Sequence, residues 1–219
     1  MPTFKKGEVV TLIFNMNRLC AAVLVPILFW VITPVMNAQA EIIPYDEAEE
    51  AESFSDVPVI TSVGKTNVKV NGVKSKYKLI EYTIPEELLT DDPDFLALMA
   101  EAEKYIGYPY VYGGSRPGTG FDCSGFVCWV FIHSGVYDTG RRGANGLHSI
   151  CTEVDEADIR PGDLVFFKGT MGRKVKGITH VGIYVGNGMM IHAGDPVGFA
   201  DLRSEKWSKK INCYGRLPY

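Results

Sequence analysis

The sequence has no excess of basic residues. Its 219 residues include 22 Lys and Arg against 26 Asp and Glu, which gives a formal net charge of −4. A protein that binds nucleic acid tends to carry a basic stripe or patch, so no nucleic-acid partner is expected. The sequence also has no visible internal repeat. Its length suits one ordinary domain with an appendage.

Cysteine is scarce, with five in the chain. No two have the C-x-x-C spacing of zinc ligands, so neither a metal nor another cofactor is expected. Cys20 lies at the start of a long apolar run, whereas a lipid-modified cysteine would follow it, so lipidation is not expected. An exported chain could pair the other four in disulfides. A chain of this size does not need such bonds, and the question stays open for Cys123, Cys128, Cys151 and Cys213.

One long apolar run, residues 19–36, follows a basic start and precedes the small residues of Ala38-Gln39-Ala40. This order is typical of a secretory signal peptide. We therefore predict that the first 40 residues export the chain across the cytoplasmic membrane and are removed after Ala40. The mature protein would be secreted or held in the cell envelope.

The alternative for residues 1–40 is an uncleaved membrane anchor, because the run over residues 19–36 is nearly long enough to span a bilayer. Pro26 and Pro34 weaken a continuous helix there, which favours cleavage. Residues 41–57 are acidic and have few large apolar side chains, so they are predicted to form a solvated linker.

Residues 58–91 have an extended pattern around Asn71-Gly72, a strong turn dipeptide. They are predicted to contain a short β-hairpin, too small for a core of its own. The lysines here could contact an anionic polymer, but a solvated strand face is the favoured interpretation; they are Lys65, Lys69, Lys74, Lys76 and Lys78.

A compact domain is predicted over residues 92–219. Asp92 and Pro93 begin a helix that Gly107 ends, and residues 124–133, apolar on every side, predict a buried helix. The apolar stripe of the first helix comprises Phe95, Leu96, Met99, Ala100, Ala102 and Ile106. Strands are predicted over 163–167, 178–185 and 189–194, with a short one near 212–214. Helices followed by antiparallel strands indicate an α+β fold.

Cys123 lies where a Gly-rich loop meets the buried helix. The positive end of the helix dipole and free backbone N–H groups are expected to lower the pKa of its thiol and to make it a nucleophile. The backbone N–H of Cys123 is a candidate oxyanion donor, and the phenol of Tyr110 or Tyr112 could reach the site. A buried structural cysteine is the competing interpretation, and Cys128 fits it well.

A thiol nucleophile needs a base, and the chain has four histidines. His133 lies about 15 Å from Cys123 along the same helix, and His148 is predicted at the surface. A three-residue loop at Gly186-Asn187-Gly188 would put His180 and His192 on one face of a hairpin, roughly 7–8 Å apart at the backbone. The opposite face would then be apolar; it comprises Val181, Ile183, Val185, Met189, Ile191 and Ala193. We expect His180 to be the base and His192 to orient it, although a pair of core histidines without a role is also possible.

These residues resemble the NlpC-type family of bacterial cell-wall cysteine peptidases over roughly residues 93–219. Four segments carry the resemblance: YPYVYGG over 108–114, FDCSGF over 121–126, RPGDL over 160–164, and HVGIY over 180–184 followed by Ile191-His192-Ala193. Any one of these segments alone would be weak, but all four in this order are highly specific.

The resemblance implies a papain-like fold and a triad of Cys123, His180 and His192. It also implies that Tyr110 lies near the catalytic cysteine, and that Asp122 and Ser124 line the substrate subsite. The family often has Arg followed by Thr or Ser after the nucleophile helix. Arg141 fits that pattern, whereas Arg142 and Gly143 depart from it.

The implied activity is hydrolysis of amide bonds in peptidoglycan stem peptides, commonly between D-glutamate and a diamino acid. The pattern is also similar to peptidases encoded with conjugative-transfer machinery, which open the wall locally. Two alternatives stay open: an acyltransferase on the same scaffold, and a non-catalytic protein that binds the cell wall.

Overall fold

The computed structural model describes residues 59–89, 92–172 and 175–219. The predicted signal or anchor over 1–40 and the predicted acidic linker over 41–57 lie outside this part of the chain. Within the described ranges, no helix is both long enough and apolar enough to cross a membrane.

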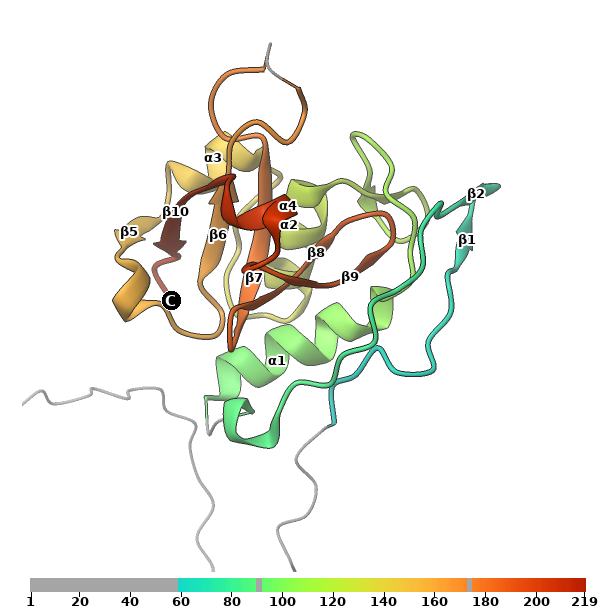
Figure 1. Cartoon of the computed structure of the whole chain (residues 1–219), viewed down its shortest axis with the longest axis horizontal. Helices are drawn as coiled ribbons and strands as arrows, with labels where there is room; N and C mark the ends of the chain where they lie inside the picture. The colour runs from blue at the N-terminus through green and yellow to red at the C-terminus, as the bar shows by residue number, and fades with distance from the viewer. Residues whose placement is uncertain (1–58, 90–91, 173–174) are drawn as a thin grey trace, which may run out of the picture. The chain divides into compact units, whose positions relative to one another are not determined.

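A six-stranded sheet organises the described domain (Figure 1). All of its neighbouring strands are antiparallel, in the order β5-β10-β6-β7-β8-β9. The strands are β5 (Thr152–Val154), β6 (Leu164–Phe167), β7 (His180–Gly186), β8 (Met189–Ala193), β9 (Val197–Asp201) and β10 (Ile211–Arg216). Four of them were predicted from the sequence. The two edge strands, β5 and β9, were not, because both are short and neither alternates cleanly between apolar and polar residues.

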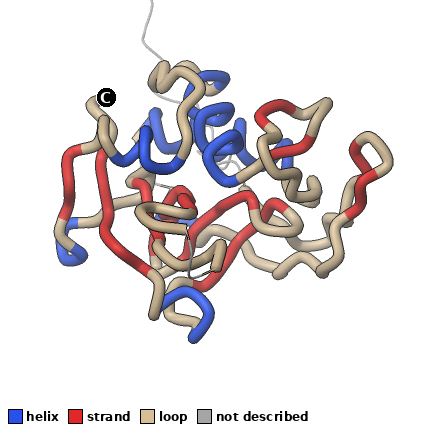
Figure 2. Tube along the Cα trace, turned by 90° about the horizontal axis from the view of Figure 1, so that it is seen from above, coloured by secondary structure: helices blue, strands red, loops and turns tan. Residues whose placement is uncertain are grey.

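The helices lie on both faces of the sheet (Figure 2). Two long helices cover one face, and a short helix with Trp207 packs on the other. Their bounds are α1 (Pro93–Ala102), α2 (Cys123–His133), α3 (Ala144–His148) and α4 (Glu205–Ser208). Single 3₁₀ turns occupy Glu86–Leu88, Glu103–Tyr105 and Glu156–Asp158, and a small ribbon pairs β3 (Ser115–Arg116) with β4 (Gly120–Phe121).

Helix α1 begins where the sequence predicts. The Oδ1 atom of Asp92 accepts hydrogen bonds from the backbone N–H groups of Asp94 and Phe95, at 3.1 and 3.2 Å. The predicted stripe is wrong at one position, because Ala100 is exposed and Leu98 is fully buried. The buried apolar positions follow the i, i+3, i+4, i+7 spacing of an amphipathic helix; they are Phe95, Leu98, Met99 and Ala102.

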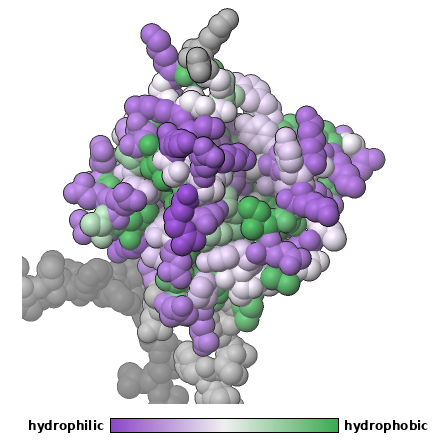
Figure 3. Space-filling view, viewed as in Figure 1, coloured by the Kyte–Doolittle hydropathy of each residue, from purple (hydrophilic) through white to green (hydrophobic). Residues whose placement is uncertain are grey.

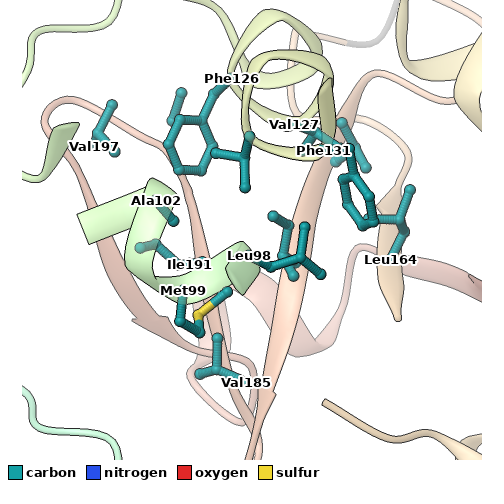
Figure 4. Close-up of a cluster of buried hydrophobic side chains, with 14 of the residues drawn as sticks. Leu98, Met99, Ala102, Phe126, Val127, Phe131, Leu164, Val185, Ile191 and Val197 are labelled. Atoms are coloured by element: carbon teal, nitrogen blue, oxygen red, sulfur yellow. The ribbon is translucent and has the colours of Figure 1, made fainter. Parts of the chain in front are cut away.

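The main core lies between the sheet and the two long helices (Figure 4). Side chains from α1 and α2 contact strand residues on one face of the sheet. The residues next to them along each strand face the other side. Leu164 and Phe166 belong to this core, whereas Val165 and Phe167 pack around Trp207. This alternation shows that the sheet is buried on both faces, as α4 and its neighbouring loops cover the second one.

The segment 59–89 is packed against this domain. Its hairpin pairs β1 (Lys69–Val70) with β2 (Val73–Lys74) across the predicted Asn71-Gly72 turn. Ile60 and Ile84 are buried in the main core cluster, and the ring of Tyr82 lies 5.0 Å from that of Phe199 in β9. The segment is therefore held by apolar contacts as well as by its own hairpin.

Candidate active site

Helix α2 presents Cys123 at its first position. The preceding Asp122 caps the helix, since its Oδ1 accepts the backbone N–H of Gly125 at 2.6 Å. A Cβ atom on Gly125 would collide with the carbonyl oxygen of Gly114, and it would come within 2.9 Å of the Cα of Ser115. The Gly-rich loop thus packs directly against the first turn of the helix, which fixes the position of the thiol.

The thiol of Cys123 is 7% exposed. Burial and the Asp122 carboxylate raise its pKa to about 11, while hydrogen bonds from backbone groups of Val181, Ser124 and Cys123 itself oppose that rise. The predicted lowering of this pKa is therefore wrong as a net effect, because desolvation outweighs the helix terminus. In the resting protein the thiol is protonated at neutral pH. Its hydrogen bond with Val181 places it beside the residue that follows His180.

The β7–β8 hairpin has the predicted register through most of its length, with Ile183 opposite Ile191. The predicted three-residue loop is wrong: Gly186 lies opposite Met189, and a bulge shifts the register between Tyr184 and Gly186. The turn is Asn187-Gly188, with φ of 49° and 70°, the left-handed geometry that matches the twist of hairpin strands. The bulge then restores the predicted apolar face, whose six residues all belong to the main core.

His180 and His192 meet on the opposite face of that hairpin. Their Nε2 and Nδ1 atoms are 2.8 Å apart, and a side chain on Gly182 would crowd the Cβ of His192 at 3.1 Å. Burial lowers the pKa of His180 to about 3, with a smaller contribution from the Lys206 charge. Burial and the neighbouring His180 also lower the pKa of His192. Both imidazoles are neutral at pH 7, so one nitrogen of each can accept a proton.

Trp207 in α4 packs against both histidines, with ring centroids 5.1 Å from His180 and 5.0 Å from His192. Lys206 lies over the indole ring, 4.9 Å from its centroid. Sequence reasoning missed both residues, because they follow the histidines on a short segment without a motif. One available signal was that a tryptophan among lysines is too large an apolar group to leave in solvent.

Asp122, Ser124 and Arg141 form a connected polar group beside the nucleophile. The carboxylate of Asp122 accepts the hydroxyl of Ser124 at 2.8 Å through Oδ1 and pairs with Arg141 at 3.0 Å through Oδ2. Arg141 also donates to the Ser124 hydroxyl at 3.2 Å. The Arg142 side chain instead donates to the carbonyl of Thr139 at 2.7 Å. The departure from the family pattern at Arg142 thus leaves the Asp122–Arg141 pair intact.

Tyr110 lies next to this group, because it forms a parallel bridge with Phe121. Burial, Cys123 and Asp122 all raise the pKa of its phenol, so the hydroxyl stays protonated and can donate a hydrogen bond. Tyr112 is 79% exposed. A cavity of about 410 Å³ connects both tyrosines with the histidine pair and Trp207.

The remaining histidines lie away from this cavity. His133, at the end of α2, stacks on Trp129 with ring centroids 3.6 Å apart. His148 is partly buried with its ring edge-on to Phe166, so the prediction of a surface position holds only in part. Cys128 is buried in α2 as expected, and no His, Cys, Asp and Glu cluster suited to a metal occurs among the described residues.

Comparison with curated proteins gives relatives that are named as endopeptidases or hydrolases. A bifunctional muramidase/DL-endopeptidase CwlT of Bacillus subtilis is 46% identical over 121 residues, which cover 55% of this chain and 36% of the relative. A gamma-DL-glutamyl hydrolase of the same species is 42% identical over 117 residues, 52% of this chain and 27% of the relative. This chain thus spans little more than a third of these relatives at most.

A solved structure supports the same relationship. An NLP/P60-family protein from Staphylococcus aureus, described as similar to lipoprotein, matches with a TM-score of 0.56 and 37% identity over 59% of this chain and 43% of that one. This match confirms the predicted papain-like α+β fold. The model of the NlpC/P60 family matches residues 107–216, from the end of the first helical segment to the last strand. The chain belongs to the NlpC/P60 family.

Proposed function

We propose that this chain is an exported cysteine endopeptidase that hydrolyses amide bonds in peptidoglycan stem peptides, at the bond between D-glutamate and a diamino acid. The observation that carries the proposal is the hydrogen-bonded pair of His180 and His192, together with a cysteine at a helix N-terminus whose thiol bonds to the backbone of Val181, the residue after His180. The names of the two Bacillus relatives, a DL-endopeptidase and a gamma-DL-glutamyl hydrolase, support the substrate class.

The roles follow from which nitrogens are engaged. Nε2 of His180 faces His192, so Nδ1 is the atom free to take the thiol proton. That role needs the tautomer in which the Nε2–H of His180 donates to Nδ1 of His192. His192 then carries its own proton on Nε2 and stabilises the imidazolium that forms on His180. His192 is therefore a positioning residue for the base.

Catalysis starts from a neutral thiol and a neutral imidazole. As Sγ of Cys123 attacks the scissile carbonyl, its proton moves to His180. The backbone N–H of Cys123 stabilises the oxyanion, and the protonated phenol of Tyr110 is a second donor. His180 returns the proton to the leaving amine, which gives a thioester. Water, deprotonated by His180, then hydrolyses the thioester and frees the thiol.

Asp122 and Ser124 line the substrate side of the nucleophile in this proposal. Their polar atoms are tied to each other and to Arg141, so they are pre-organised before substrate binds. Arg141 is 43% exposed at its side chain and keeps donors for a substrate carboxylate. These contacts support recognition of an acidic stem peptide, because guanidinium groups bind carboxylates in a fixed geometry.

Acyl transfer to an amine is the main alternative, because a thioester can react with an amine instead of water. Incubation of a stem peptide with excess free amino acid separates the two activities by mass spectrometry. We expect the shortened peptide acid as the dominant product. A dominant new amide would instead support the transferase. A protein that only binds the wall would give neither product, and its Cys123 would not react faster than Cys128 with a thiol probe.

Export is part of the proposal, although residues 1–57 lie outside the described chain. We propose that a signal over residues 1–40 precedes an acidic linker over 41–57 and a catalytic domain over 92–219. N-terminal sequencing of exported protein is expected to begin at Glu41, after the Ala38-Gln39-Ala40 site. A sequence that begins at Met1 or Pro2 would establish a membrane anchor through 19–36 instead. Either form could open the wall locally for conjugative-transfer machinery.

A further inference from the structure

A second cavity, of about 500 Å³, adjoins the one that contains the histidine pair. The two cavities share five lining residues, which form the boundary between them: His192, Gly194, Asp195, Lys206 and Trp207. The space beside His192 therefore continues past α4 and along β9. A substrate bound beside the histidine pair can therefore extend into the second cavity.

The outer wall of this second cavity comes from residues 77–80, which lie outside the range matched by the family model. Three contacts hold this wall in place. The backbone N–H of Lys76 donates to Oδ2 of Asp195 at 3.3 Å, and Tyr82 packs on Phe199. Leu79 occupies the space that a side chain on Gly198 would need, 2.9 Å from the position of its Cβ. The segment 59–89 therefore forms part of the wall of the second cavity.

The charges around the second cavity favour an anionic ligand. Its two carboxylates are already engaged, Asp195 by the backbone of Lys76 and Asp201 by Arg203 at 2.8 Å. Its two ammonium groups, on Lys78 and Lys206, form no ion pair within the described part of the chain. An incoming carboxylate therefore meets two lysines that form no ion pair in the described residues, against one carboxylate, Asp195, whose contact is a backbone N–H rather than a cation.

The rest of the lining is apolar and partly open to solvent. Tyr77 and Ile80 are 68% and 53% exposed although both line the cavity. Figure 3 shows a hydrophobic area over β9 between hydrophilic side chains. Large exposed apolar side chains that gather around a cavity mark a binding surface more often than scattered ones do. The ligand that fits has a small apolar body and a carboxylate.

We infer that this second cavity is a substrate-positioning subsite that binds the C-terminal carboxylate of the stem peptide, with Lys78 and Lys206 as its cations. The inference rests on the proposed function. Binding energy from a part of the substrate remote from the reacting bond can hold that bond against the nucleophile. The segment 59–89 thereby adds to the specificity of a domain that the family shares.

Steady-state kinetics with two peptides tests the subsite: one stem peptide with a free C-terminal carboxylate and the same peptide as its C-terminal amide. Wild-type protein is expected to show a KM about fivefold lower for the acid, the upper value for one exposed charge pair, and the preference should shrink as salt rises. Lys78→Ala should raise the KM of the acid toward that of the amide, with the remaining preference due to Lys206. Lys206 is less suitable for this test, because it also lies beside His180.

Lys69→Ala is the matched control, since Lys69 is an exposed lysine of the same segment that lines neither cavity. It should keep the wild-type preference for the acid. Equal KM values for both peptides in wild-type protein, or equal effects of the two lysine variants, would overturn the subsite and leave the proposed function standing. If neither peptide is hydrolysed by wild-type protein, the proposed function and the subsite both fail.

Discussion

Replacing Cys123 with alanine is expected to lower kcat/KM on a stem peptide by about 10⁴-fold or more. No other described thiol is positioned to replace it, because Cys128 is enclosed in α2, Cys151 lies next to the edge strand β5, and Cys213 lies in β10 beside it. The remaining groups could still bind substrate but could not form the thioester. Rates of peptide cleavage by the variant and the wild-type protein measure the loss.

The Cys123→Ala variant should still fold. The cap of α2 depends on the carboxylate of Asp122 rather than on the thiol, and an alanine at this buried position removes only the hydrogen bonds between the thiol and nearby backbone groups. Thermal unfolding followed by circular dichroism would verify this. Cys128→Ala is the matched control, because it removes a second buried thiol from the same helix and should keep most of the activity. If Cys123→Ala clears peptidoglycan at the wild-type rate, the nucleophile is misassigned.

The second large effect concerns the histidine pair. His180→Ala should be nearly as damaging as loss of Cys123, because nucleophile and base act as a unit and their losses do not add. His192→Ala should lower the rate less, since it removes only the group that orients the base. His192→Asn should lower the rate least of the three variants, because its amide oxygen can still accept a hydrogen bond from the Nε2–H of His180. Single-turnover rates on a short stem peptide would give this order.

His133→Ala and His148→Ala are the controls for that series. His133 stacks on Trp129 at the far end of α2, and His148 contacts Phe166, so neither touches the cavity around His192. Both variants should retain the chemistry at wild-type rates. Equal and small losses for His180→Ala and His192→Ala would mean that the pair is structural, and the proposed mechanism would fall with it.

The position of the histidine pair could be predicted from the sequence because of alternation along the hairpin. Six apolar residues fix which face is buried against α1 and α2, and a strand has only two faces. His180 and His192 must then share the other face. The details of the turn could not be predicted in the same way. The two-residue Asn187-Gly188 turn and the bulge between Tyr184 and Gly186 give the same alternation as a three-residue loop.

The electrostatic environment of Cys123 depends on packing that no local pattern contains. A helix N-terminus predicts a lowered thiol pKa. The extent to which β7 and the Gly-rich loop bury the thiol decides whether its pKa is in fact lowered or raised. The position of Trp207 beside the histidines could not be predicted from the sequence for a related reason. Trp207 reaches the histidines only because the chain that follows the edge strand β9 brings α4 over the second face of the sheet, and β9 itself was not predicted.

The bond that is hydrolysed tests the central claim most directly. Purified protein and its Cys123→Ala variant would be incubated with intact peptidoglycan, and the released fragments would be sequenced by mass spectrometry. The account predicts fragments that end in D-glutamate and matching fragments that begin with the diamino acid, from the wild-type protein alone. Fragments cut only within the glycan strands, or the same stem-peptide fragments from the Cys123→Ala variant, would contradict it.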